Sequence, residues 1–249
     1  MRQLVSLVLC LAVAAVCSAQ GSEFREPWKS ADAALVLDPF DDNSIDFDKV
    51  ATEPRVVAII HQATQGVDDK DNKYAARRAE AKRRGYRWGS YHLGKSGDPI
   101  AQADFYLATA KPGDDEVMAL DIEAMTSKDM SLPNARRFLQ RVQEKTGRLP
   151  MVYGNDNVIR TISTSFRKDE VFSKTRLWYA RFRKEIPNFP RGTWETYTVW
   201  QFSSEINCTP ARPDACLILI PGTKTDMDVN VFHGTADELK AQWPFKNPV

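Results

Sequence analysis

The amino-acid sequence predicts an α/β fold, an irregular TIM-like β/α barrel in which helices become sparse in the last third. Short apolar, β-prone runs alternate with helical patterns as far as Tyr153, which is typical of a parallel sheet with helices outside it. Eight such runs occupy about 200 residues, which suits a closed barrel better than an open, doubly wound sheet. The sequence shows no internal repeat and no linker rich in Ser, Gly or Pro, so we expect one domain.

The expected elements follow one another along the chain. The strands are residues 34–38, 56–60, 88–93, 117–123, 151–153, 177–182, 198–202 and 227–232. The helices are residues 74–84, 100–110 and 132–146. In the last helix, apolar residues recur at helical spacing: Leu132, Ala135, Phe138, Leu139 and Val142. Asp98 and Pro99 are typical of a helix N-cap and first turn, so the second helix is expected to begin there.

The first 19 residues have the pattern of a secretory signal peptide. Arg2 precedes the apolar run at residues 4–16, and small residues follow up to Ala19. The run is shorter than the roughly 20 residues that a membrane-spanning helix needs. We therefore expect a secreted, extracellular protein without a membrane span. Residues 20–33 are expected to form an N-terminal extension, residues 34–240 the barrel domain and residues 241–249 a C-terminal tail.

The charge of the secreted chain implies no electrostatic partner. Removal of the signal peptide takes away one base, Arg2, and leaves 33 basic against 33 acidic side chains. The basic cluster at residues 77–87 reads RRAEAKRRGYR and fits a solvated helix face that ends at Gly85, with Glu80 and Arg84 spaced for an i,i+4 pair. We expect no nucleic-acid partner, and a monomer.

Two cysteines remain after the signal peptide is removed, Cys208 and Cys216. In an oxidising compartment they are expected to form a disulfide across a loop of seven residues. Asn207 begins the sequence Asn-Cys-Thr, which is an acceptor site for N-glycosylation in cells that perform it.

One stretch resembles a nucleotide site. GSYHLGKS, residues 89–96, matches the phosphate-loop pattern G-x-x-x-x-G-K-[ST], and residues 117–123 resemble the Mg²⁺-binding acid run of nucleotide hydrolases. A phosphate loop must follow a strand and open a helix. Here the strand itself runs through residues 89–93, and the next helix begins only at Asp98. The match is therefore interpreted as a coincidence, with no nucleotide partner and with Lys95 in an exposed loop.

Paired carboxylates are the stronger chemical signal. Asp121 and Glu123 end an apolar strand and share one face, about 6.6 Å apart along the backbone. Two close carboxyl groups do not both ionise readily, so one stays protonated, as glycoside hydrolysis requires. The alternative is a strand end whose acids pair with basic neighbours. Asp38 ends the first strand and Asp228 lies in the last, so a closed barrel would bring both acids to the same mouth.

Other candidate residues surround these acids. Aromatic side chains on strands are candidates to stack on sugar rings, with core packing as the competing role for each: Tyr91, Tyr153, Trp178 and Trp200. The remaining acids of interest fall in loops and are interpreted as solvated: Asp41, Asp42, Asp68, Asp69 and Asp71. The three histidines, His61, His92 and His233, lack metal-ligand spacing, so we expect neither a metal nor another cofactor.

Nine segments between Ala34 and Leu239 resemble, in order, glycoside hydrolase family 25, the N-acetylmuramidases often called Chalaropsis-type lysozymes. The first five are LDPFDDNSIDFDKV, AIIHQATQG, WGSYHLG, QADFYL and MALDIE. The other four are TGRLPMVY, LWYARF, VWQFSS and PGTKTDMDVNVFHG. The resemblance implies an irregular β/α barrel that acts on bacterial peptidoglycan. The bond cut would be the β-1,4 bond from N-acetylmuramic acid to N-acetylglucosamine, with retention of configuration.

The resemblance also implies roles for the acids. Glu123 would be the general acid. Asp121 would be the nucleophile or would steady the acetamido group of the substrate, and these alternatives stay open. Asp38 and Asp228 would shape the charge of the site. We also expect substrate to be bound by Tyr91, Tyr153, Trp178 and Gln201.

The chain departs from the family pattern at three places. Pro39-Phe40 follows Asp38 where the family usually has x-Ser, Gln62 and Gln65 replace the usual Lys and Glu, and residues 208–216 interrupt the approach to the last strand. A second function class therefore remains, a glycan-binding protein on the same barrel with weak or no catalysis. The intact acids argue against this alternative, and the two glutamines favour it.

Overall fold

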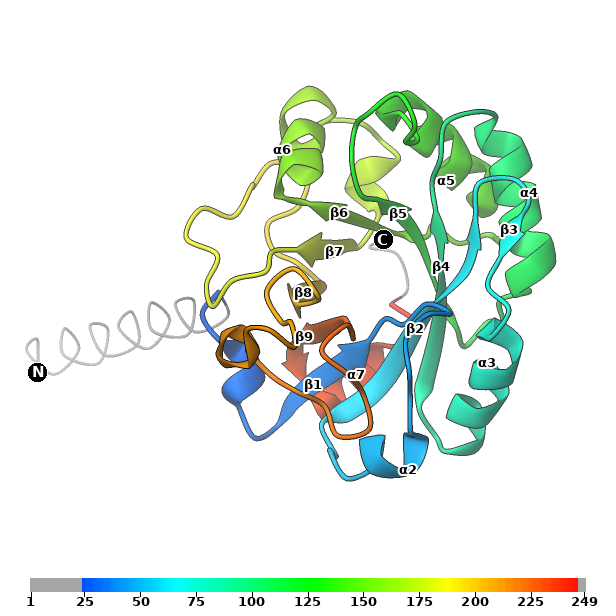
Figure 1. The fold of residues 1–249 in the computed structure, drawn as a ribbon. Helices are drawn as coiled ribbons and strands as arrows, with labels where there is room; N and C mark the ends of the chain where they lie inside the picture. Colours follow the sequence, from blue (N-terminus) through cyan, green and yellow to red (C-terminus); the bar gives the residue numbers. More distant parts are fainter. Residues whose placement is uncertain (1–23, 246–249) are drawn as a thin grey trace, which may run out of the picture.

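The computed structural model describes residues 24–245 and shows a closed barrel of strands with helices outside it (Figure 1). The strands are β1 (Ala33–Leu37), β2 (Val56–Gln65), β3 (Asp69–Lys70), β4 (Arg87–Leu93), β5 (Val117–Ile122), β6 (Met151–Asn155), β7 (Leu177–Ala180), β8 (Val199–Ser203) and β9 (Val229–Thr235). All eight predicted strands are present, and the predicted barrel is confirmed. β3 is a two-residue addition that pairs only with the end of β2. The predicted signal peptide lies outside the described residues.

The order of the strands shows how the barrel closes. From β1 to β8, omitting β3, each strand runs parallel to its predecessor. The last strand, β9, is antiparallel to both of its neighbours, β8 and β1. The first and last strands are therefore adjacent, as predicted. The reversed direction of β9 was not predicted.

The helices cover the outside of the barrel. They are α2 (Phe47–Val50), α3 (Tyr74–Arg83), α4 (Pro99–Ala110), α5 (Leu132–Thr146), α6 (Asp156–Ser165) and α7 (Ala236–Gln242), with short 3-10 helices η1 (Pro27–Lys29), η2 (Phe172–Lys174) and η3 (Pro213–Ala215). The three predicted helices are confirmed, and the Asp98 side chain caps α4 by accepting from Ile100 N. Within residues 24–245, no helix combines the length and the apolar character needed to cross a lipid bilayer.

Helix α6, which follows β6, was not among the predicted helices. This helix of sequence DNVIRTISTS is rich in β-branched and hydroxyl residues, which have modest helix propensity. It forms because Val158, Ile159 and Ile162 are buried on one face, and because the Asn155 side chain caps its first turn. Tertiary packing therefore outweighs the weak local preference.

Alternation along the strands separates two buried layers. One cluster fills the inside of the barrel and includes Ala34, Val36, Ala58, Ile60, Ala119, Met151, Trp178, Val199 and Phe232. The other lies between strands and helices and includes Leu35, Leu37, Ile59, Trp88, Leu120, Phe138 and Ile159. Because successive residues face opposite sides of a strand, the same alternation decides which polar residues face the barrel mouth.

Segments before and after the barrel strands also pack against the barrel. Trp28, in η1, is 2% exposed and stacks on the Phe202 ring with 3.9 Å between ring centroids. Beyond α7, Trp243 and Phe245 are buried. These aromatic residues, which lie outside residues 34–240, therefore contribute to the hydrophobic core.

The predicted disulfide between Cys208 and Cys216 is present, in the loop between β8 and β9. Replacing both cysteines by serine should lower the free energy of unfolding by up to about 2 to 3 kcal/mol, because the cross-link restricts a short loop of the unfolded chain. Denaturant unfolding of the variant and its parent measures this difference. A loss below about 0.5 kcal/mol, the size of an ordinary surface change, would contradict the expectation.

Candidate active site

A cleft of about 340 Å³ opens at the barrel mouth, where the parallel strands end. Seven carboxylic acids line it: Asp38, Asp41, Asp69, Asp121, Glu123, Glu205 and Asp228. The other lining residues are Phe40, Gln62, Gln65, Tyr91, Leu93, Tyr153, Trp178 and Gln201. The four acids assigned to catalysis and the four residues assigned to substrate binding, Tyr91, Tyr153, Trp178 and Gln201, are brought together in this one cleft, whereas Trp200 lies outside it.

The alternation of the strands explains how the acids reach the cleft. Along β1, Ala34 and Val36 point into the barrel and Asp38 follows in the same row; along β5, Ala119 precedes Asp121 in the same way. Neighbouring strands continue the row, because Asp121 pairs in register with Tyr153 of β6. The inward rows are apolar within the barrel and polar at its mouth.

The position of Asp228 depends on the reversed direction of β9. Asp228 directly precedes β9, and its carbonyl accepts a hydrogen bond from Asp38 N at 3.3 Å. If β9 ran parallel to the other strands, the residue before it would lie at the opposite end of the barrel. The antiparallel strand therefore places Asp228 beside Asp38, which was predicted only from the closure of the barrel.

Asp121 lies deep in the cleft, with 7% of its surface exposed. Its Oδ1 atom is buried and has no hydrogen-bond partner among residues 24–245. Burial, reinforced by the negative charge of Glu123, raises the pKa of Asp121 well above its usual value. The positive charge of Lys95 acts in the opposite direction.

Glu123 directly follows β5 and is accessible to solvent at the cleft surface. Partial burial of its carboxyl group by the cleft walls still raises its pKa. Lys95 opposes this rise, whereas the negative charges of Asp129 and Glu205 add to it. Because like charges at short distance oppose double ionisation, the Asp121–Glu123 pair loses its second proton less readily than its first.

Asp38 and Asp228 form a second buried carboxyl pair. Burial raises the pKa of both groups well above the usual value, and the negative charge of Asp228 adds to the effect on Asp38. A short hydrogen-bond chain orients Asp38: Tyr153 OH donates to Gln201 Oε1 at 2.6 Å, and Gln201 Nε2 donates to Asp38 Oδ2 at 2.8 Å. Gln201 and Tyr153 therefore support the acids as well as lining the cleft.

The aromatic candidates have different surroundings. Trp178 is 1% exposed and lies edge-on to Tyr91 and Tyr153, with 6.0 and 5.0 Å between ring centroids, and its Nε1 donates to Asn230 Oδ1 at 2.6 Å. Only a small edge of Trp178 is available to a ligand. Trp200 has the competing role, core packing, because its side chain is fully buried between the strands and the outer layer, outside the cleft.

The loop acids Asp41 and Asp69 were interpreted as solvated, but both line the cleft. Glu205, which the sequence analysis did not single out, also lines it, two residues after the end of β8. Their place in the sequence could have identified them, because each of these acids lies close to a strand end at the barrel mouth. Composition alone did not distinguish them from exposed loop acids.

Lys95 is half-buried rather than exposed, which corrects the sequence-based expectation. Its backbone N–H donates to Gln102 Oε1 at 3.0 Å, and its carbonyl accepts from Gln102 Nε2 at 2.8 Å. A β-bridge to Asp129 fixes it against the loop after β5. The predicted strand through residues 89–93 is confirmed as part of β4, so GSYHLGKS forms that strand and its exit.

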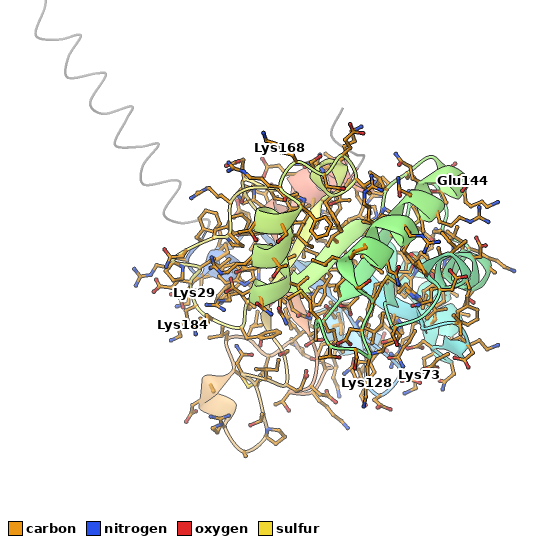
Figure 2. The ribbon with its side chains drawn as sticks, turned by 90° about the horizontal axis from the view of Figure 1, so that it is seen from above. Lys29, Lys73, Lys128, Glu144, Lys168 and Lys184 are labelled. Atoms are coloured by element: carbon orange, nitrogen blue, oxygen red, sulfur yellow. A yellow bond between two sulfur atoms is a disulfide. The ribbon has the colours of Figure 1, made fainter. Side chains whose placement is uncertain are left out.

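Figure 2 shows the molecule from above, turned by 90° from the view of Figure 1. Lys73, directly before α3, and Lys128, in the loop after β5, lie along the same edge of the molecule. The disulfide-containing loop before β9 extends from this edge.

Asn207, the predicted glycosylation site in that loop, donates from Nδ2 to Phe202 O and accepts at Oδ1 from Ser204 N. Its amide therefore already has partners within the fold, and the modification stays a prediction.

Comparisons with known proteins agree with this geometry. The family model described as glycosyl hydrolases family 25 matches residues 40–210, more than half of the chain. Lysozyme M1 of Streptomyces globisporus is 26% identical over 194 residues, covering 72% of this chain and 61% of the relative. The autolytic lysozyme of Clostridium acetobutylicum is 28% identical over 210 residues, covering 80% of this chain and 60% of the relative. The chain thus spans about three fifths of these relatives.

The fold also matches a solved structure. The crystal structure of the bacterial lysozyme from Streptomyces coelicolor superposes with a TM-score of 0.69 at 21% identity, covering 85% of this chain and 97% of that chain. At this identity the likeness establishes the fold alone. The family match over residues 40–210 is the direct evidence of relationship, and the chain therefore belongs to glycosyl hydrolases family 25.

Proposed function

We propose that the chain is a secreted muramidase that hydrolyses the β-1,4 bond between N-acetylmuramic acid and N-acetylglucosamine in bacterial peptidoglycan. One observation carries the proposal: Asp121 and Glu123 project into the same cleft with raised pKa values, one buried and the other accessible. A glycoside hydrolase needs a protonated acid that reaches the glycosidic oxygen and a second carboxylate that supports positive charge at the sugar carbon.

The two acids divide these tasks according to their positions. Glu123 is accessible at the cleft surface, so it is the group that donates a proton to the leaving oxygen. Asp121 lies below it and either attacks the sugar carbon or steadies the acetamido group of the substrate as that group attacks. In either route the sugar carbon undergoes two successive displacements, each with inversion, so its configuration is retained overall. Asp228 adds negative charge to the cleft and thereby raises the proton affinity of Asp121, and the charge of Asp121 in turn raises the proton affinity of Asp38.

The two relatives from Streptomyces globisporus and Clostridium acetobutylicum are lysozymes by name, which supports peptidoglycan as the substrate. The leader pattern at residues 1–19 and the disulfide support an oxidising, extracellular location. The alternative function class, a binding protein without catalysis, gives a different result in a simple assay. The enzyme releases soluble reducing ends from purified peptidoglycan, whereas a binding protein is retained on the wall without releasing them.

Lys95 provides a test of the charge balance at the acids. Replacing Lys95 by Met removes a positive charge that favours the ionised forms of Asp121 and Glu123, so the pKa values of both groups should rise. Both limbs of the pH–rate profile for peptidoglycan hydrolysis should therefore move to higher pH, while the variant keeps most of its activity at the optimum. Lys128→Met, a change in the neighbouring loop, is the matched control. An unshifted profile for Lys95→Met would contradict the proposed charge balance.

A further inference from the structure

Arg77 lies on α3 and reaches the loop between β1 and α2, which forms part of the cleft wall. Its Nη1 donates to Phe40 O at 2.8 Å, and its Nη2 donates to Asn43 O at 2.5 Å. The guanidinium group therefore spans the loop with two N–H donors fixed in one plane. A lysine has a single ammonium group and cannot reproduce this geometry.

His61, on β2, contacts the same guanidinium group. Arg77 Nη1 lies 3.0 Å from His61 Nε2, and arginine has no acceptor, so Nε2 accepts the hydrogen bond. The other ring nitrogen, Nδ1, then carries the proton and donates to Gln62 O at 2.7 Å. Burial lowers the pKa of His61 to about 3, so the ring remains a neutral acceptor at neutral pH. Arg77 is thereby held on one side by the barrel and on the other by the loop.

The loop held by Arg77 carries three residues of the cleft, Asp38, Phe40 and Asp41. The carbonyl of Asp41 also accepts from Lys73 Nζ, which lies directly before α3. Arg77 and Lys73 therefore contact three carbonyl groups of this loop, those of Phe40, Asp41 and Asn43, while Pro39 O accepts from Gln62 N of β2. The geometry of the cleft wall depends on these contacts.

Asn43 connects the loop held by Arg77 to the segment that carries Asp228. Its Oδ1 accepts from Phe40 N at 2.8 Å, and its Nδ2 donates to Asp226 O at 2.9 Å. Asp226 lies two residues before Asp228, in the segment that leads into β9. Fixing Asn43 therefore also constrains the chain that carries Asp228.

We propose that Arg77, with neutral His61 as its acceptor, is a positioning residue that sets the cleft wall and the Asp38–Asp228 pair for substrate binding and turnover. The expected effect on turnover rests on the proposed function. It does not place Arg77 in contact with the substrate. Its effect is transmitted through the carbonyl groups of Phe40 and Asn43.

The next residue of α3 supplies a matched control. Arg78 donates to both carboxylate oxygens of Glu116, at 2.9 and 2.8 Å, and Glu116 directly precedes β5. This contact lies at the end of the barrel opposite to the cleft. Arg78→Met leaves a buried carboxylate with fewer partners, so it should lower the melting temperature without altering the cleft. Arg77→Met and Arg78→Met thus separate an effect on the cleft from an effect on stability.

We expect Arg77→Met to lower kcat on peptidoglycan on the order of tenfold, measured well below its melting temperature, because small displacements of reacting groups are costly. Arg77→Lys should recover only part of this loss. Addition of methylguanidine at a concentration that does not denature the protein should partly restore kcat in Arg77→Ala. Arg78→Met should keep the kcat of the parent despite its lower melting temperature.

Equilibrium binding of a peptidoglycan glycan fragment gives a second measurement that needs no turnover. Arg77→Met should weaken this binding, and Arg78→Met should not. If the parent protein binds the fragment but does not hydrolyse peptidoglycan, the proposed function is refuted. The role of Arg77 is then still tested by comparing the fragment affinities of the two variants. Unchanged kcat and unchanged fragment affinity in Arg77→Met, or equal losses in both variants, would overturn the positioning role.

Discussion

Glu123→Gln is expected to lower peptidoglycan turnover by about a hundredfold or more, because the amide keeps the shape of the side chain but has no proton to donate to the leaving oxygen. Glu123 is the accessible member of the acid pair at the cleft surface, whereas Asp121 is buried. Release of reducing ends from purified peptidoglycan at saturating substrate measures the change.

Two further observations define the control for Glu123. The variant should retain the melting temperature of the parent and its binding to insoluble wall, because the substituted side chain is exposed and nearly unchanged in size. Glu205→Gln makes the same chemical change in the same cleft, in a residue with no assigned proton transfer. If Glu123→Gln remained nearly as active as the parent, or if Glu205→Gln were equally damaged, Glu123 would not be the general acid.

Asp121→Asn is the second change with a large expected effect. It removes the negative charge that supports the sugar cation or the acetamido group, so turnover should fall by about a hundredfold or more. It also removes the like charge that makes loss of the second proton from the pair unfavourable. The alkaline limb of the residual activity should therefore move to lower pH. The pH–rate profiles of the parent and the variant, measured on the same peptidoglycan, test both effects.

Asp121→Asn and Lys95→Met are informative together. Asp121→Asn should shift the alkaline limb downwards, whereas Lys95→Met should shift it upwards, because one removes a negative and the other a positive charge near the same proton. Full activity in Asp121→Asn would remove this residue from the mechanism. A profile with an unmoved alkaline limb would show that Asp121 and Glu123 titrate independently.

Much of the barrel and of its acid cluster was predictable from local pattern. Apolar runs gave the eight strands, and the spacing of Asp121 and Glu123 gave their common face. Helix α6 was missed because its stability comes from burial of one face, which the Ser- and Thr-rich sequence does not indicate. The direction of β9 was missed because strand periodicity is the same in both orientations.

Contacts between distant segments were the least predictable. Lys95 was expected to be exposed, yet Gln102 and the loop after β5 hold it close enough to affect both Asp121 and Glu123. The approach of Asp41 to the cleft depends on α3 and the segment before it, which hold a loop distant from them in sequence. Such placements arise from the closed barrel, and no local sequence signal contains them.

The measurement that tests the central claim most directly identifies the sugar at each newly formed reducing end. Peptidoglycan is digested with the parent and with Glu123→Gln, the products are reduced with borohydride, and the reduced sugars are determined after hydrolysis. The account predicts that reduced N-acetylmuramic acid accumulates with the parent and not with Glu123→Gln. Accumulation of reduced N-acetylglucosamine, or release of no reducing ends by a folded parent that binds the wall, would contradict it.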